Sequence, residues 1–197
     1  LMVVSSAWTY PQPTKNYDRL IEIYEALADY GYREVGQEYL QNVLNTDKKL
    51  DAYDSGRIYY YLGDYQKAYL ALEEAKGKGG VDSYLYLGKA YAATGDYNYA
   101  SSVYSNYLSK QGPDAEIYNQ LGLCELAKKD YQKALEAFQA GKQIEGNSLM
   151  QTLSFNEIVA YEYLQDYQKA AVLLKAYLQN YPDDQAAIRE QQFLSTR

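Results

Sequence analysis

Apolar residues along most of the chain recur every three or four positions, which is the spacing of one face of an α-helix. Tyr84, Leu87 and Tyr91 show this spacing in one stretch, and Ala134 and Phe138 show it in another. Short stretches with glycine, proline or aspartate separate the apolar runs. The pattern predicts pairs of helices joined by tight turns, and therefore an all-α fold.

A six-residue phrase joins the two helices of each predicted pair and recurs along the chain. Its copies are 63–68, 95–100, 129–134 and 165–170, with a weaker copy at 31–35. The last residues of successive copies lie 32 to 36 positions apart. A fixed period of this length is the sequence signature of a repeat array.

Each residue type in the phrase has a physical role at its position. The aspartate of the last four copies stands where a second helix begins, so its carboxylate can accept hydrogen bonds from free backbone N–H groups. Gly63 and Gly95 ease the turn before it. The final alanine comes one turn into the second helix, where a small side chain lets two helices approach closely. The phrase therefore predicts a helix, a turn and a second helix.

These residues resemble the tetratricopeptide repeat (TPR), which combines a Leu-Gly pair, a tyrosine one turn later and a small residue in the second helix. The third unit matches through Leu87-Gly88, Tyr91, Gly95, Tyr97, Ala100 and Tyr104. The fourth unit departs from the pattern with Glu125 in place of the tyrosine, and the fifth has Glu157-Ile158 in place of Leu-Gly. The resemblance covers residues 16 to 182 and implies stacked helix pairs.

We therefore expect an α-solenoid of five TPR-like helix-turn-helix units followed by a C-terminal capping helix. The expected segments are a non-repeat segment 1–15, repeats 16–48, 49–80, 81–114, 115–148 and 149–182, and a cap 183–197. The expected helices are 17–29, 32–45, 50–62, 65–77, 82–94, 97–110, 115–128, 131–144, 150–164, 167–180 and 184–194.

Two parts of the chain give expectations about where the protein is located in the cell. The apolar run in residues 1–13 is far shorter than a membrane span, so no transmembrane segment is expected in this chain. Ser5-Ser6-Ala7 matches the small-residue end of a signal peptide, while the alternative is a segment that packs on the first repeat or lies in a groove. The part around 160–164 and 181–194 is similar to exported TPR lipoproteins of Gram-positive bacteria. That similarity implies a membrane-tethered protein, although a cytoplasmic one fits the composition equally well.

The charge and composition of the chain exclude several classes of ligand and of catalytic site. Lys and Arg number 19 against 26 Asp and Glu, a net charge of −7, which argues against binding nucleic acid. Histidine is absent and Cys124 is the single cysteine, so Ser-His-Asp triads, Cys-His pairs and histidine or cysteine metal sites are excluded. We expect Cys124 to be a buried core thiol, and the protein to be no enzyme and to need no cofactor or metal.

The chain contains 26 tyrosines, more than the repeat pattern demands. In an array of this type the first helices line the concave face, so residues just off their packing stripe point into a groove. The expected groove residues are Tyr24, Tyr53, Arg57, Tyr60, Lys89, Asn119, Leu123, Phe155, Val159 and Glu162. An aromatic groove with two cations suits a peptide or helix segment whose acidic group meets Arg57 and Lys89.

Other interpretations remain open at this point. The exposed tyrosine faces also suit a carbohydrate or cell-wall binding module, and the repeats also suit a structural spacer or self-association domain of a larger envelope protein. A clamp for the C-terminal carboxylate of heat-shock chaperones is not expected, because Leu20 and Tyr24 occupy its slots in the first unit. The leading hypothesis is a non-enzymatic scaffold with a protein or peptide partner.

Overall fold

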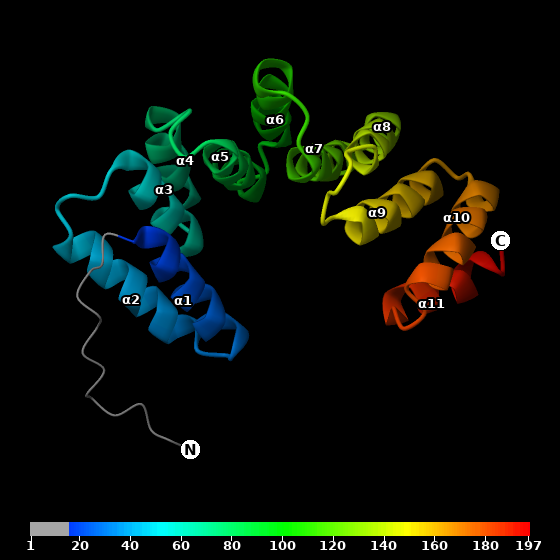
Figure 1. The fold of residues 1–197 in the computed structure, drawn as a ribbon, viewed down its shortest axis with the longest axis horizontal. Helices are drawn as coiled ribbons and strands as arrows, with labels where there is room; N and C mark the ends of the chain where they lie inside the picture. The colour runs from blue at the N-terminus through cyan, green and yellow to red at the C-terminus, as the bar shows by residue number, and fades with distance from the viewer. Residues whose placement is uncertain (1–15) are drawn as a thin grey trace. The chain divides into compact units, whose positions relative to one another are not determined.

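The computed structural model describes residues 16–197, which form eleven α-helices and no strand (Figure 1). The helices are α1 (Tyr17–Asp29), α2 (Arg33–Thr46), α3 (Ala52–Tyr61), α4 (Tyr65–Glu74), α5 (Val81–Ala93), α6 (Tyr97–Gln111), α7 (Ala115–Ala127), α8 (Tyr131–Lys142), α9 (Met150–Tyr163), α10 (Tyr167–Asn180) and α11 (Gln185–Leu194). The all-α prediction is confirmed, and every helix end lies within three residues of its predicted position. The predictions for residues 1–13 fall outside the described residues.

The aspartates of the repeated phrase are helix N-caps, as predicted. Each carboxylate accepts a hydrogen bond from the backbone N–H three residues further on, at 3.0 to 3.3 Å. The four caps are Asp64 on α4, Asp96 on α6, Asp130 on α8 and Asp166 on α10. Such a cap contributes about 1 kcal/mol to stability. The recurrent aspartate therefore fixes where the second helix of a pair begins.

The position before each cap has a left-handed backbone conformation. Gly63 and Gly95 have φ angles of +79° and +85°, and Lys129 and Gln165 take the same place with φ of +64° and +63°. A non-glycine residue costs roughly 1–2 kcal/mol in this region because its Cβ approaches the following carbonyl oxygen. The fourth and fifth repeats therefore keep the same turn, although Lys129 and Gln165 are less stable in this backbone conformation than glycine is.

Small residues allow the two helices of a pair to approach closely. The alanines that end the phrase are fully buried; they are Ala68, Ala100, Ala134 and Ala170. Opposite them, a Cβ added to Gly56 of α3 would lie 2.6 Å from Cγ of Leu72 on α4. Gly122 of α7 faces the ring of Phe138 on α8 in the same way. Both glycines therefore lie where two helices cross at close range.

The chain divides into two compact units, one that ends at Ala90 and one that covers Tyr91–Arg197, so the boundary lies within α5. In the first unit, residues of α1, α2 and α3 share one apolar core: Leu20, Ile21, Tyr24, Tyr39, Leu40, Val43 and Ile58. In the second unit, Ala187 and Leu194 of α11 are buried against α9 and α10. α11 thus closes the end of the second unit, as expected of a capping helix.

Among residues 16–197, no helix combines the length and apolar character that crossing a membrane requires.

Candidate functional site

Tyrosines from four helices of the first unit form a continuous aromatic cluster. Tyr61, the last residue of α3, packs against Tyr24 of α1 with 5.2 Å between ring centroids and against Tyr86 of α5 with 5.8 Å. Its neighbour Tyr60 contacts Tyr61, Tyr86 and Tyr65 at 5.3, 5.6 and 5.7 Å. Tilted and edge-to-face pairs at these distances stabilise one another beyond their area burial. The cluster therefore arises where α3 ends and α4 begins.

A chain of hydroxyl groups crosses this cluster. The Tyr61 hydroxyl donates to Oε1 of Glu25 at 2.7 Å and lies 3.0 Å from the Tyr86 hydroxyl. Burial, together with these two neighbours, raises the pKa of Tyr61 well above its usual value, and burial also raises the pKa of Tyr60. Both rings are therefore neutral hydrogen-bonding groups at physiological pH.

The cluster borders a pocket of about 460 Å³ within the first unit. Its lining residues are Tyr24, Glu25, Ala28, Asp29, Arg33, Tyr60, Tyr61 and Tyr65. Glu25 and Asp29 lie four residues apart on α1, a spacing that puts both carboxylates on one side of the helix. We call this site the tyrosine pocket. Its size falls in the range of binding sites for small groups, and it combines aromatic walls with a charged rim.

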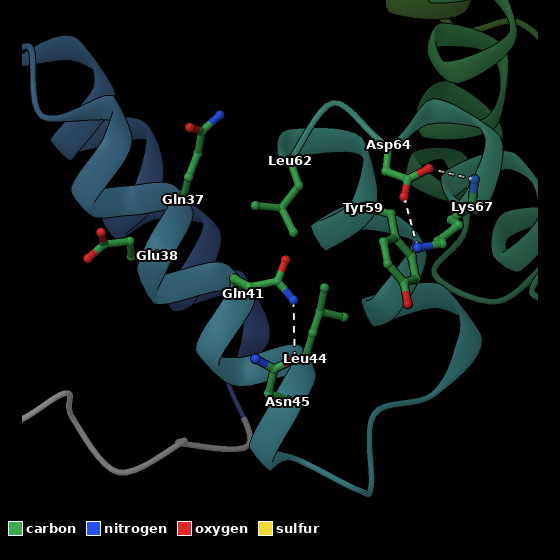
Figure 2. A pocket seen from close by; sticks show the side chains of 9 residues that line it. All are labelled: Gln37, Glu38, Gln41, Leu44, Asn45, Tyr59, Leu62, Asp64 and Lys67. Atoms are coloured by element: carbon green, nitrogen blue, oxygen red, sulfur yellow. Dashed lines mark hydrogen bonds and ion pairs between the residues drawn. The ribbon is translucent and has the colours of Figure 1, made fainter.

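A larger cavity, of about 650 Å³, lies beside α2. Gln37, Gln41 and Asn45 line it from α2, while Asp64 and Lys67 line it from the start of α4 (Figure 2). Several of these groups bind one another: Gln41 donates to Asn45 at 3.2 Å, and Lys67 pairs with Asp64 at 3.1 Å. Because these four polar groups are paired with one another and Tyr59 is the one aromatic side chain that lines the cavity, it is the weaker candidate.

Comparison with known proteins identifies the repeats. Residues 85–148 match one tetratricopeptide repeat family model, and residues 155–184 match another. These two stretches are tetratricopeptide repeats. The TPR prediction made from the turn phrase is thus confirmed, and the resemblance to exported lipoproteins stays a prediction. No curated protein matches the chain.

Solved TPR structures share the fold at low sequence identity. A thermophilic TPR protein of Thermus thermophilus is 15% identical with a TM-score of 0.69, covering 92% of this chain and 100% of its own. YrrB, described as a TPR protein with an unusual peptide-binding site, is 20% identical with a TM-score of 0.62, covering 88% and 90%. MamA of Desulfovibrio magneticus RS-1 is 19% identical with a TM-score of 0.61, covering 87% and 98%. These likenesses establish the fold.

Two of the ten residues that the sequence assigns to a groove lie in the tyrosine pocket: Tyr24, which is largely buried, and Tyr60, which is half-buried. The other pocket residues were missed. Tyr65 belongs to the repeated turn phrase, and Tyr61 follows Tyr60 directly. Neighbouring tyrosines at the end of a first helix are the sequence signal that marks this site.

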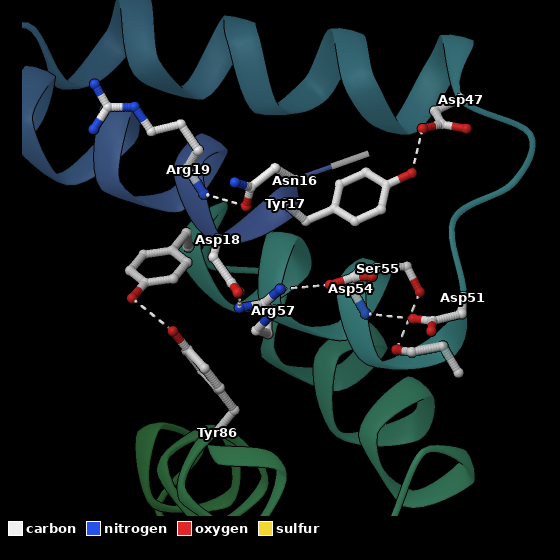
Figure 3. Close-up of polar contacts among 12 residues, drawn as sticks. Asn16, Tyr17, Asp18, Arg19, Asp47, Asp51, Asp54, Ser55, Arg57 and Tyr86 are labelled. Atoms are coloured by element: carbon white, nitrogen blue, oxygen red, sulfur yellow. Dashed lines mark hydrogen bonds and ion pairs between the residues drawn. The ribbon is translucent and has the colours of Figure 1, made fainter. Parts of the chain in front are cut away.

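The structure places Arg57 differently from its predicted role as a groove cation. Its side chain is 7% exposed, and its guanidinium binds Asp18 at 2.6 Å and Asp54 at 2.5 Å (Figure 3). It also lies 4.4 Å from the ring centroid of Tyr53, the groove residue one turn earlier. These ion pairs neutralise the charge of Arg57 and link α1 to α3. Arg57 is therefore a structural residue and not a cation that faces a ligand.

The remaining predicted groove residues are distributed over the two units. Lys89 of α5 is half-buried. In the second unit Asn119 is buried and accepts a hydrogen bond from Asn156 at 2.8 Å, Phe155 packs on Tyr177, Val159 is half-buried, and Leu123 is 40% exposed. Within the first unit, Lys89 is not among the residues that line the tyrosine pocket.

Glu162 of α9 is half-buried, and Glu190 of α11 lies near it. Burial and the charge of Glu190 raise the pKa of Glu162 to about 7. Its Oε1 atom is buried without a hydrogen-bond partner in the described chain. The carboxyl therefore favours the protonated form more than an exposed glutamate does.

The single cysteine, Cys124, is buried in the core of the protein. Cys124 is 4% exposed, and burial raises the pKa of its thiol to about 12, so the prediction of a buried core thiol is confirmed. The thiolate needed for nucleophilic attack is therefore scarce at neutral pH. Within residues 16–197, no group of three His, Cys, Asp or Glu side chains is placed to hold a metal ion.

Proposed function

We propose that this protein is a non-enzymatic interaction scaffold and that the tyrosine pocket of its first unit anchors a peptide or helical segment of a partner protein. The observation that carries the proposal is the pocket itself, with four tyrosines around one cavity. Tyrosine supplies a large rigid contact area and a hydroxyl at low conformational-entropy cost, which is why it dominates binding hot spots.

Relatives of the same fold support this assignment. YrrB is described as having a peptide-binding site, and the second TPR domain of human RPAP3 was solved in complex with an HSP70 peptide, at 16% identity and a TM-score of 0.50, covering 56% of this chain and 90% of its own. These descriptions concern those proteins. They make a peptide the natural first ligand class to test here.

The pocket is held by its own packing before any ligand binds. Tyr24 is 4% exposed, its hydroxyl donates to the carbonyl oxygen of Tyr61 at 3.3 Å, and its ring packs against Tyr61. Because these side chains are already ordered, a ligand does not have to bear the cost of ordering them on binding. The proposal therefore places the anchor on α1 and α3, near the start of α4.

A selection experiment tests the proposal. Random dodecapeptides displayed on phage are selected against the immobilised chain, and the affinities of selected peptides are measured by calorimetry against Tyr60→Leu and Tyr30→Leu variants. Tyr30 is the matched control because its side chain is 82% exposed and does not line the pocket. We expect Tyr60→Leu to weaken binding roughly tenfold and Tyr30→Leu to leave it unchanged. Equal affinities for both variants, or no enriched peptide, would refute the proposal.

A further inference from the structure

We infer that the tyrosine pocket holds a cationic side chain, a lysine or arginine of the bound segment, with its charge against the tyrosine rings and between Glu25 and Asp29. This inference rests on the proposed function, since it names the chemistry that the pocket recognises. It also reverses the charge expected from the sequence, which predicts an acidic group on the partner facing Arg57.

The aromatic part of the pocket suits a cation. The lining rings form one connected set, Tyr24 to Tyr61 to Tyr60 to Tyr65, with successive centroids 5.2 to 5.7 Å apart. A ring face attracts a cation within about 6 Å through its quadrupole, more strongly when the cation is desolvated. Within residues 16–197, none of these four rings has a lysine or arginine over it.

The acidic part of the pocket supplies the countercharge. The Glu25 carboxylate accepts the hydroxyl of Tyr61, so it is held beside the ring that forms the middle of the cluster. Asp29, one turn further along α1, makes no hydrogen bond or ion pair within the described chain. One carboxylate is therefore fixed at the aromatic wall, and a second is available next to it.

The first unit itself shows that this combination binds cations. Arg57 lies 4.4 Å from the ring centroid of Tyr53 and is paired with Asp54, and the Lys67 ammonium lies 5.6 Å from the ring centroid of Tyr59 and is paired with Asp64. In both cases a tyrosine ring and an aspartate hold one positive charge. The tyrosine pocket offers the same two groups to a side chain from outside.

The net charge of the chain favours a basic ligand, whereas one residue at the pocket rim opposes it. The net charge of −7 attracts a basic segment and raises its rate of encounter. Arg33, the first residue of α2, is the one cation among the described residues that lines the pocket. It opposes the bound cation, so its removal is expected to strengthen binding.

Three capped pentapeptides test the inference: acetyl-Gly-Gly-X-Gly-Gly-amide, with X as lysine, norleucine or glutamate. Each is titrated into the isotope-labelled chain while amide chemical shifts are recorded. We expect the lysine peptide to shift amides of α1, α3 and the start of α4, and the norleucine peptide to bind roughly fivefold or more weakly. Equal binding of lysine and norleucine, or preference for glutamate, would overturn the inference.

Two variants probe the carboxylates and the rim separately. Glu25→Gln with Asp29→Asn keeps both side-chain shapes and should lose most of the preference for lysine over norleucine, and Arg33→Gln should strengthen lysine binding about twofold. The second change is a gain, so it does not arise from damaged folding. An unchanged preference in the carboxylate variant, or weaker binding in the Arg33 variant, contradicts the inference.

Failure of this inference is distinguishable from failure of the proposed function. If the selected dodecapeptides depend on Tyr60 but bind as well after every lysine and arginine is replaced by norleucine, the scaffold role stands and the cation is wrong. If no peptide depends on Tyr60, the proposed function itself fails.

Discussion

Replacing Gly122 with alanine tests the packing of the second unit. Glycine in the middle of a helix normally costs about 1 kcal/mol relative to alanine, so the change would stabilise an open site by that amount. Here the added Cβ would lie 2.7 Å from both Cδ1 and Cζ of Phe138, and it would lie closer still to Cε1. Since ordinary carbon–carbon contacts are about 3.5–4.0 Å, the ring would have to move by about 1 Å.

Phe138 is fully buried in the same core cluster as Ala134 and Leu153, so moving its ring disturbs closely packed neighbours. Overpacking a core costs about 1–3 kcal/mol, which exceeds the gain in helix propensity. We therefore expect Gly122→Ala to lower the free energy of unfolding by about 1–2 kcal/mol and the melting temperature by roughly 3–8 °C.

Urea denaturation followed by circular dichroism measures this difference, and a second variant isolates its cause. In Gly122→Ala/Phe138→Leu the smaller side chain makes room for the new methyl group, so the double variant should be more stable than the sum of the two single changes predicts. A Gly122→Ala protein that is more stable than the parent would refute the close approach of α7 and α8.

Three further changes test other parts of the account, each followed by thermal or urea denaturation. Arg57→Met should cost about 3 kcal/mol because it leaves Asp54 partly buried without its ion pair; an unchanged melting temperature would contradict the link between α1 and α3. The raised pKa of Glu162 favours folding below its unfolded value of 4.5, an advantage lost as pH rises through about 7. Glu162→Gln should therefore stabilise the protein by about 1 kcal/mol at alkaline pH after allowing for solvent screening, and not in acid; the same gain at both would exclude the pKa effect. Lys129→Gly should stabilise the turn by about 0.5–1 kcal/mol because its φ of +64° suits glycine, whereas a loss would show that the turn has another conformation.

Periodicity and the turn phrase were enough to predict the fold. The aspartate before each second helix, the alanine one turn into that helix and the glycine of the turn each have one local role. Their positions therefore define the helices without knowledge of distant contacts. The left-handed turn at Lys129 and Gln165 was less visible, because the conformation is set by the repeat geometry and not by the residue that occupies it.

The candidate site was only partly predictable. Tyr24 and Tyr60 stand out as tyrosines beyond the repeat pattern, but the sequence does not show that Tyr61 and Glu25, separated by 36 positions, share a hydrogen bond. For Arg57 the sequence suggests an exposed groove cation, whereas the structure shows a buried side chain with two ion pairs. It looked like a surface cation because its partner Asp18 lies 39 positions away in another helix, a pairing that helix periodicity does not reveal.

The most direct test of the scaffold proposal is to locate a selected peptide on the chain. A spin label is attached to the end of the tightest dodecapeptide, and the broadening of amide signals is mapped along the isotope-labelled protein. The account predicts broadening centred on the end of α1, the end of α3 and the start of α4, which is lost in the Tyr60→Leu variant and kept in Tyr30→Leu. Broadening centred on other helices, or broadening that survives in Tyr60→Leu, would contradict the central claim that the tyrosine pocket anchors the partner.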